Sequence, residues 1–130
     1  MLFTGGSEPK PATNTAHLRL YHHNLCPFSG RARYSLSAKA VPFQECMVDL
    51  NEKAQWHIEA NGGAAPLLET TSGDLIPESS IIARFALESN PDGGIQLIPT
   101  DPVAAMRMRV KMEDFNKTLP GFFPMVLSRG

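Results

Sequence analysis

The stretch NLCPFSGRARYSLSAKA, residues 24–40, places a cysteine and a proline where a helix is predicted to begin. Proline suits the first helical turn, because its ring fixes a helical φ and its missing N–H is not needed there. An apolar row follows at four-residue spacing, which is typical of one buried helix face; it comprises Phe28, Ala32, Leu36 and Ala40. The sequence therefore predicts a helix with Cys26 just before its start and Pro42 at its end.

Strand and helix patterns alternate on both sides of this helix. Alternating apolar and polar side chains predict short strands, and turn residues separate the segments. The predicted elements are a strand at 17–23, the helix after Cys26, a strand at 43–50, a helix at 51–60 closed by Asn61-Gly62-Gly63, strands at 67–70 and 74–76 joined by a hairpin turn, and a helix at 79–88 capped by Ser79. This βαβαββα order predicts an α/β fold.

Composition divides the chain into four segments. Residues 1–16 are rich in Pro, Gly, Ser and Thr and are predicted to form a disordered leader. Residues 17–88 hold the α/β domain, and a high density of turn residues makes 89–100 a linker. Residues 101–130 are predicted to begin a helical segment with Asp101 as its cap.

The 130-residue chain is 42% apolar and 19% charged, as is typical of a globular protein, and its net charge is −1. This charge argues against nucleic acid or an anionic membrane as the main partner. No apolar run approaches the roughly 18 residues of a membrane-spanning helix, and the N-terminus lacks a signal-peptide pattern. With only Cys26 and Cys46 present, a reduced, cytoplasmic chain is predicted. The histidines show no metal-ligand spacing, so no metal site is predicted.

Cys26 is the first candidate for chemistry. A free thiol has a pKa of about 8.5, and a helix N-terminus lowers it to roughly 3.5–7.5 because orphan N–H groups stabilise the thiolate. From the residues alone, a reactive thiolate and a small buried apolar residue both fit this position. Ser29 stands where a Cys-x-x-Cys pair has its second cysteine, so any redox cycle needs an external thiol. Cys46, on a predicted strand, fits a buried structural thiol better than a resolving one.

Four segments, taken in order, resemble a known family. They are LRLYHHNLCPFSGRARYSLSAKAVPF, LNEKAQW, APLLETTSGDLIPES and GIQLIPTDP. Together they are similar to the N-terminal half of a glutathione transferase, and the cysteine with the downstream LIPTDP is most similar to the omega class. The resemblance implies a thioredoxin-like glutathione-binding domain at 17–88, followed from 101 by the start of a truncated all-helical domain.

The resemblance also implies roles for individual residues. Cys26 would form a mixed disulfide with glutathione, which would be the co-substrate, with no metal involved. The implied glutathione-binding residues are Phe28 and Lys53 beside the tripeptide, Ala65 with its backbone against the cysteinyl unit just before a cis Pro66, and Glu78 and Ser79 at the γ-glutamyl end. The sequence departs from the family in its short, glycine-rich NGGAAP loop.

The resemblance implies a glutathione-dependent thiol transferase that reduces disulfides or dehydroascorbate through Cys26. The alternative is a non-catalytic binding or regulatory module of the same fold. A cluster-binding monothiol glutaredoxin is disfavoured by Pro27 and by the transferase-like C-terminal part. A homodimer is also expected, because apolar side chains of the last helix need a covering surface; they are Val103, Met106, Val110, Phe115, Leu119, Phe122, Phe123, Met125, Val126 and Leu127.

Overall fold

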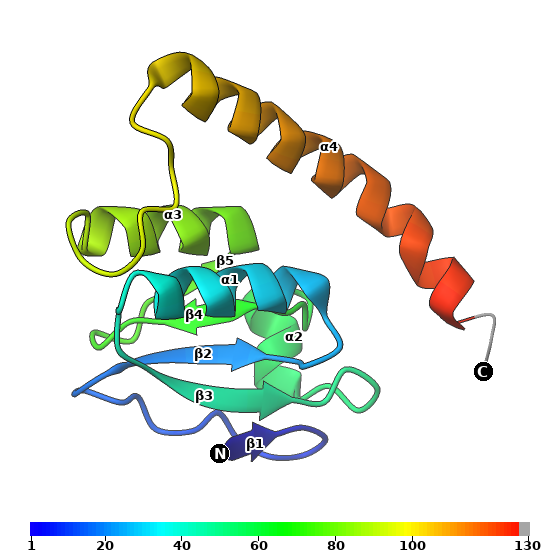
Figure 1. Cartoon of the computed structure of the whole chain (residues 1–130). Coiled ribbons are helices and arrows are strands. Elements are labelled where there is room, and N and C mark those ends of the chain that lie inside the picture. Colours follow the sequence, from blue (N-terminus) through cyan, green and yellow to red (C-terminus); the bar gives the residue numbers. More distant parts are fainter. Residues whose placement is uncertain (128–130) are drawn as a thin grey trace. The chain divides into compact units, whose positions relative to one another are not determined.

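The computed structural model describes residues 1–127 and divides into two compact units, one up to Ile95 and one from Gln96 onward (Figure 1). Its elements are β1 (Leu2–Thr4), β2 (Leu18–His22), α1 (Pro27–Ala38), β3 (Phe43–Val48), α2 (Gln55–Asn61), β4 (Leu67–Glu69), β5 (Leu75–Pro77), α3 (Ser79–Ser89) and α4 (Pro102–Leu127). The predicted α/β class and the βαβαββα order are confirmed, with one strand added at the N-terminus.

The five strands of the first unit form one sheet in the order β1-β3-β2-β4-β5. The strands β1, β3 and β2 are parallel, whereas β4 runs antiparallel to both β2 and β5. Because side chains alternate along a strand, each strand contributes to two different faces. On β2, for example, Leu20 belongs to one buried cluster and Tyr21 to the other.

Helices α1 and α3 lie side by side over one face of the sheet (Figure 1). The buried cluster on this face comprises Leu20, Ala32, Leu36, Leu68, Ile82 and Ala86. The opposite face is covered in part by α2, whose Trp56 packs against a second cluster of Tyr21, Cys46, Val48 and Leu67. The apolar row predicted for α1 is therefore buried at Ala32 and Leu36, whereas Ala40 lies beyond the end of the helix and is exposed.

The prediction of a disordered leader over residues 1–16 is wrong. Residues 2–4 form β1, which pairs in parallel register with Cys46–Val48 on the outer edge of β3. A buried polar network then holds the following residues against the sheet. Local composition does not predict this strand, because its partners Cys46–Val48 on β3 are distant from it in the chain.

This network, which we call the Glu69 network, centres on a carboxylate that is only 1% exposed. Glu69 accepts hydrogen bonds from Thr13 Oγ1 at 2.8 Å, Tyr21 OH at 2.9 Å and Arg19 Nη1 at 3.2 Å, and it forms an ion pair with Lys10. Burial alone raises the pKa of Glu69, but the hydrogen bonds from Lys10, Thr13 and Tyr21 outweigh it and lower the pKa below its usual value. The network therefore stabilises an ionised carboxylate inside the protein.

The second unit contains α4, which begins as predicted. The Ala104 N–H donates to Asp101 Oδ2 at 2.7 Å, so Asp101 is the helix cap. Val103, Met106 and Val110 are exposed along this helix. The side chains of Phe122, Phe123, Met125, Val126 and Leu127, and all of residues 128–130, lie outside the described residues. The homodimer thus stays a prediction.

Within residues 1–127, no helix combines the length and the apolar character that a membrane crossing requires.

Candidate functional site

The register of the sheet brings three segments of the chain to one end of it. Tyr21 pairs with Leu67, and Leu67 pairs with Pro77, so the C-terminal ends of β2 and β5 lie beside the first residue of β4. The loop to Cys26 follows β2, the Ala65–Pro66 bond immediately precedes β4, and Glu78 immediately follows β5. Segments that are distant in sequence therefore meet at the same end of the sheet, and the predicted site residues Cys26, Ala65, Pro66 and Glu78 lie on them.

Cys26 occupies the position that the sequence predicts, immediately before α1. It is the N-cap residue, with extended backbone angles φ −90° and ψ 115°, and its carbonyl accepts the first helical hydrogen bond from Gly30 N–H at 3.0 Å. The residue is 9% exposed, and the first turn of α1 contains no acidic side chain. Orphan N–H groups of the first turn are consequently available to a thiolate, without a neighbouring carboxylate to oppose it.

The loop before Cys26 is held by hydrogen bonds in which atoms of His23 and Ser29 are the acceptors. The Cys26 N–H donates to His23 O at 3.0 Å, and the Leu25 N–H donates to His23 Nδ1 at 3.2 Å. Ser29, which is 1% exposed, accepts from the His23 N–H at 3.2 Å. Ser29 therefore fixes the loop backbone, a role that its place in the Cys-x-x-Ser pattern did not suggest.

Ala65 faces the thiol of Cys26. The distance between Cys26 Sγ and Ala65 O is 3.6 Å, which is within reach of a weak S–H···O hydrogen bond. The Ala65–Pro66 bond is cis, as predicted. Two of the residues that the resemblance implied, far apart in sequence, are thus in direct contact.

Lys53 lies against the glycine-rich loop that leads to Ala65. Gly62 closes α2 in the left-handed conformation at φ 74°, with its N–H bonded to Ile58 O at 2.7 Å. Gly63 follows at φ 68°, and a side chain there would collide with the aliphatic stem of Lys53. The two glycines therefore let the chain turn tightly while Lys53 passes over it.

The same loop is held from α2 by two side chains that sequence reasoning missed. His57 Nε2 and Asn61 Nδ2 each lie 2.9 Å from Ala64 O. His57 is 1% exposed, and burial lowers its pKa, although the hydrogen bond to Ala64 acts in the opposite direction. The i, i+4 spacing of His57 and Asn61 before a glycine turn was the available signal, since it places both on one helix face.

Glu78 and Ser79 lie at the start of α3, and their capping roles differ from the prediction. Glu78, not Ser79, is the N-cap; it is exposed and has φ 74°, a conformation that is rare for a residue with a side chain. Ser79 is the first helical residue and is 4% exposed.

Phe28 is on the first turn of α1, where the Arg31 guanidinium carbon lies 5.6 Å from the centroid of the Phe28 ring.

Cys46 is fully buried on β3, among the side chains that face α2. Burial raises the pKa of its thiol to about 11. The thiol is therefore protonated at neutral pH, which makes Cys46 a poor nucleophile.

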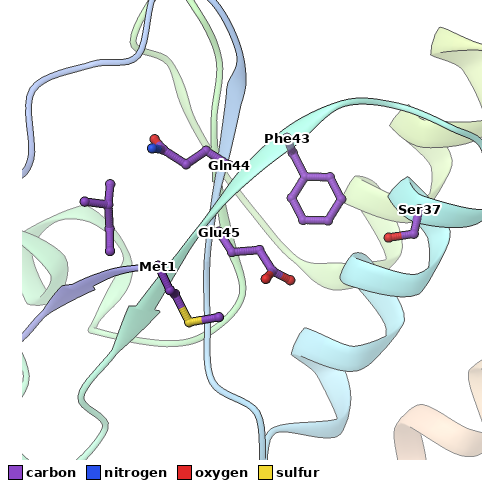
Figure 2. A pocket seen from close by; sticks show the side chains of 6 residues that line it. Met1, Ser37, Phe43, Gln44 and Glu45 are labelled. Carbon is purple, nitrogen blue, oxygen red and sulfur yellow. The ribbon is translucent and has the colours of Figure 1, made fainter.

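A hollow beside the start of β1 and the first residues of β3 is separate from these residues. It is lined by Met1, Leu2, Ser37, Phe43, Gln44 and Glu45. Figure 2 shows Phe43, Gln44 and Glu45 on β3 and Ser37 on α1 around it. None of the predicted site residues contributes to this lining.

Among the His, Cys, Asp and Glu side chains of residues 1–127, no group of three or more is placed to hold a metal ion.

We expect the free energy of unfolding to decrease as the pH falls below about 6.5. Burial lowers the pKa of both His22 and His57 from 6.5, even though Glu45 raises that of His22. Between the folded and unfolded values the unfolded chain binds more protons, so acid favours unfolding. Urea unfolding between pH 7.5 and about 5 measures this effect.

The exposed His17 provides the control for this titration. The variant His17→Gln should show the same pH dependence as the wild type, because it leaves both buried imidazoles, His22 and His57, in place. A stability that is constant or rises between pH 7 and about 5.5 would contradict the assignment of two buried neutral imidazoles.

Known proteins are similar to this chain in sequence and in fold. A family model described as "Glutathione S-transferase, N-terminal domain" matches residues 20–94. Glutathione S-transferase omega-1 of Mus musculus is 31% identical over 125 residues, which cover 95% of this chain and 51% of the relative. Glutathione transferase Omega 3C from Trametes versicolor superposes with a TM-score of 0.71 at 28% identity, covering 85% of this chain and 48% of that one.

A glutathione transferase homologue from Sulfitobacter, solved with bound glutathione, superposes with a TM-score of 0.64 at 25% identity and covers 75% of this chain and 47% of that one. The expected thioredoxin-like fold and the similarity to the omega class are thereby confirmed. The chain spans about half the length of the curated relatives that it matches.

Proposed function

Since the chain belongs to the glutathione S-transferase family, we propose that its first unit is a glutathione-dependent thiol transferase with Cys26 as the nucleophile. The observation that carries the proposal is the contact at 3.6 Å between Cys26 Sγ at the start of α1 and Ala65 O. It brings the thiol to the backbone against which the tripeptide would lie. The helix N-terminus supplies the electrostatic support that a thiolate requires.

The reaction that we propose consists of two thiol–disulfide exchanges. The Cys26 thiolate attacks the glutathionyl sulfur of a mixed disulfide, forming a Cys26–glutathione disulfide and expelling the substrate thiolate, which takes up a proton. The thiolate of a second glutathione then attacks the glutathionyl sulfur of this intermediate. Oxidised glutathione leaves and the Cys26 thiolate is restored. The second glutathione is needed because Ser29 replaces an internal resolving cysteine.

The other proposed contacts hold glutathione in place. In this proposal, Ala65 pairs through its backbone with the cysteinyl unit, and Lys53 lies beside the tripeptide with Phe28. Glu78 accepts hydrogen bonds from the γ-glutamyl ammonium, while Ser79, at the helix start, donates from its hydroxyl and its backbone N–H to the γ-glutamyl carboxylate. The strained φ of 74° at exposed Glu78 supports this role, because such conformations cluster at binding sites.

The proposal predicts one covalent adduct when the protein is incubated with oxidised glutathione. The intact mass should increase by one glutathionyl group, and peptide mapping should place this group on Cys26 rather than on the buried Cys46. Addition of reduced glutathione should remove it. An adduct on Cys46, or no adduct on folded protein, would contradict the proposed chemistry. An adduct without turnover in a disulfide reduction assay would favour a non-catalytic binding module.

A further inference from the structure

The loop from Gly62 to Pro66 has few means of holding its own shape. Its residues are two glycines with positive φ, two alanines and a proline, so none of them has a side chain that donates a hydrogen bond. Gly62 and Gly63 N–H groups bond back to α2, but the following residues depend on contacts from outside the loop.

The Ala64 carbonyl receives those contacts. His57 Nε2 and Asn61 Nδ2 each lie 2.9 Å from the Ala64 oxygen. A carbonyl oxygen has two lone pairs, so these two contacts occupy both of them. Because a carbonyl only accepts, His57 Nε2 carries the proton in this contact. The lowered pKa that burial gives His57 agrees with a neutral ring in that tautomer.

The His57 ring is itself firmly placed. It stacks on Trp56 with 5.2 Å between ring centroids, and Trp56 contacts the Tyr21 ring on the sheet at 4.9 Å. The Trp56 Nε1–H also donates to Thr4 Oγ1 at 3.2 Å. His57, which holds the loop, is therefore connected to the sheet through Trp56.

We propose that His57 is a positioning residue, which orients the Ala65 N–H toward glutathione by holding the Ala64 carbonyl. The reason is covalent: the Ala64 carbonyl and the Ala65 N–H belong to one planar peptide group, in which they point in opposite directions. Fixing the carbonyl toward α2 therefore fixes the N–H on the opposite side. This inference rests on the proposed function, in which Ala65 pairs with the cysteinyl unit of the tripeptide.

The test compares two replacements of His57. The variant His57→Phe keeps a ring against Trp56 but has no donor, whereas His57→Gln keeps an N–H donor. We expect His57→Phe to raise the KM and the Kd for glutathione about tenfold, with a smaller change in kcat, and His57→Gln to stay within about twofold of the wild type. Equal effects of both variants at equal Tm, or an unchanged KM in folded His57→Phe, would overturn the proposal.

Hydrogen exchange in the absence of glutathione separates this inference from the proposed function. Amides of residues 63–65 should exchange faster in His57→Phe than in His57→Gln, whether or not the wild type binds glutathione. A wild type that binds no glutathione would refute the proposed function, whereas equal exchange in both variants would refute the anchoring role of His57.

Asn61→Ala provides a second variant should His57→Phe fold poorly, since Asn61 is only partly buried and donates to the same carbonyl. It should raise the KM for glutathione several-fold, because one of the two bonds to the Ala64 carbonyl is lost. An unchanged KM and unchanged exchange in Asn61→Ala would count against the anchor.

Discussion

Replacing Cys26 by serine is expected to abolish glutathione-dependent thiol transfer, a loss of at least three orders of magnitude in kcat/KM, on the order of what removal of an enzymatic nucleophile costs. Serine keeps the N-cap position and nearly the same volume, so the fold should persist. Its hydroxyl cannot form the mixed disulfide on which both exchange steps depend. A coupled assay of disulfide reduction with glutathione measures the effect, and circular dichroism confirms that the variant is folded.

Cys46→Ala is the matched control for this experiment. The Cys46 thiol is fully buried and its pKa is raised to about 11, so it contributes neither a thiolate nor an accessible sulfur. Most of the activity should therefore remain after its replacement, with some loss of stability from the small cavity. Activity that survives in Cys26→Ser and disappears in Cys46→Ala would reverse the assignment of the nucleophile.

The features that the sequence predicted well are those with local causes. Pro27 and the apolar row fix where α1 begins and which of its faces is buried, and the glycine pair fixes the end of α2. The alternation of strand residues gives the order of elements. Family resemblance then supplied what local pattern does not contain, including the cis bond between Ala65 and Pro66.

The features that were missed depend on tertiary contacts. Residues 2–4 form a strand because the outer edge of β3 is open to them, and that edge exists only in the folded sheet. The role of His57 was hidden for a similar reason, because its acceptor is a backbone carbonyl, which has no sequence signal. Glu78 adopts a positive φ although its side chain disfavours it, which local propensity does not predict.

Glu69→Leu is expected to lower the free energy of unfolding by about 3–5 kcal/mol, the usual cost of leaving a buried charge without its partner. Arg19 is 5% exposed and would keep only neutral acceptors, which are Gln44 Oε1, Ala12 O and Tyr21 OH. Lys10 and Thr13, in the leader, would lose the Glu69 carboxylate, to which both donate and which holds the leader on the sheet. Urea unfolding at pH 7 measures the loss, and hydrogen exchange of residues 1–16 should show the leader detaching first.

Two further variants decide whether the buried charge causes this loss. Glu88→Ala removes an exposed carboxylate that pairs with exposed Arg84, and it should leave stability nearly unchanged because solvent screens such a pair. The double variant Arg19→Met/Glu69→Leu removes both charges from the interior. It should recover much of the stability, since apolar residues often replace a buried ion pair without loss. If Glu69→Leu is as stable as the wild type, or the double variant is less stable than Glu69→Leu, the network is not held together by the buried carboxylate.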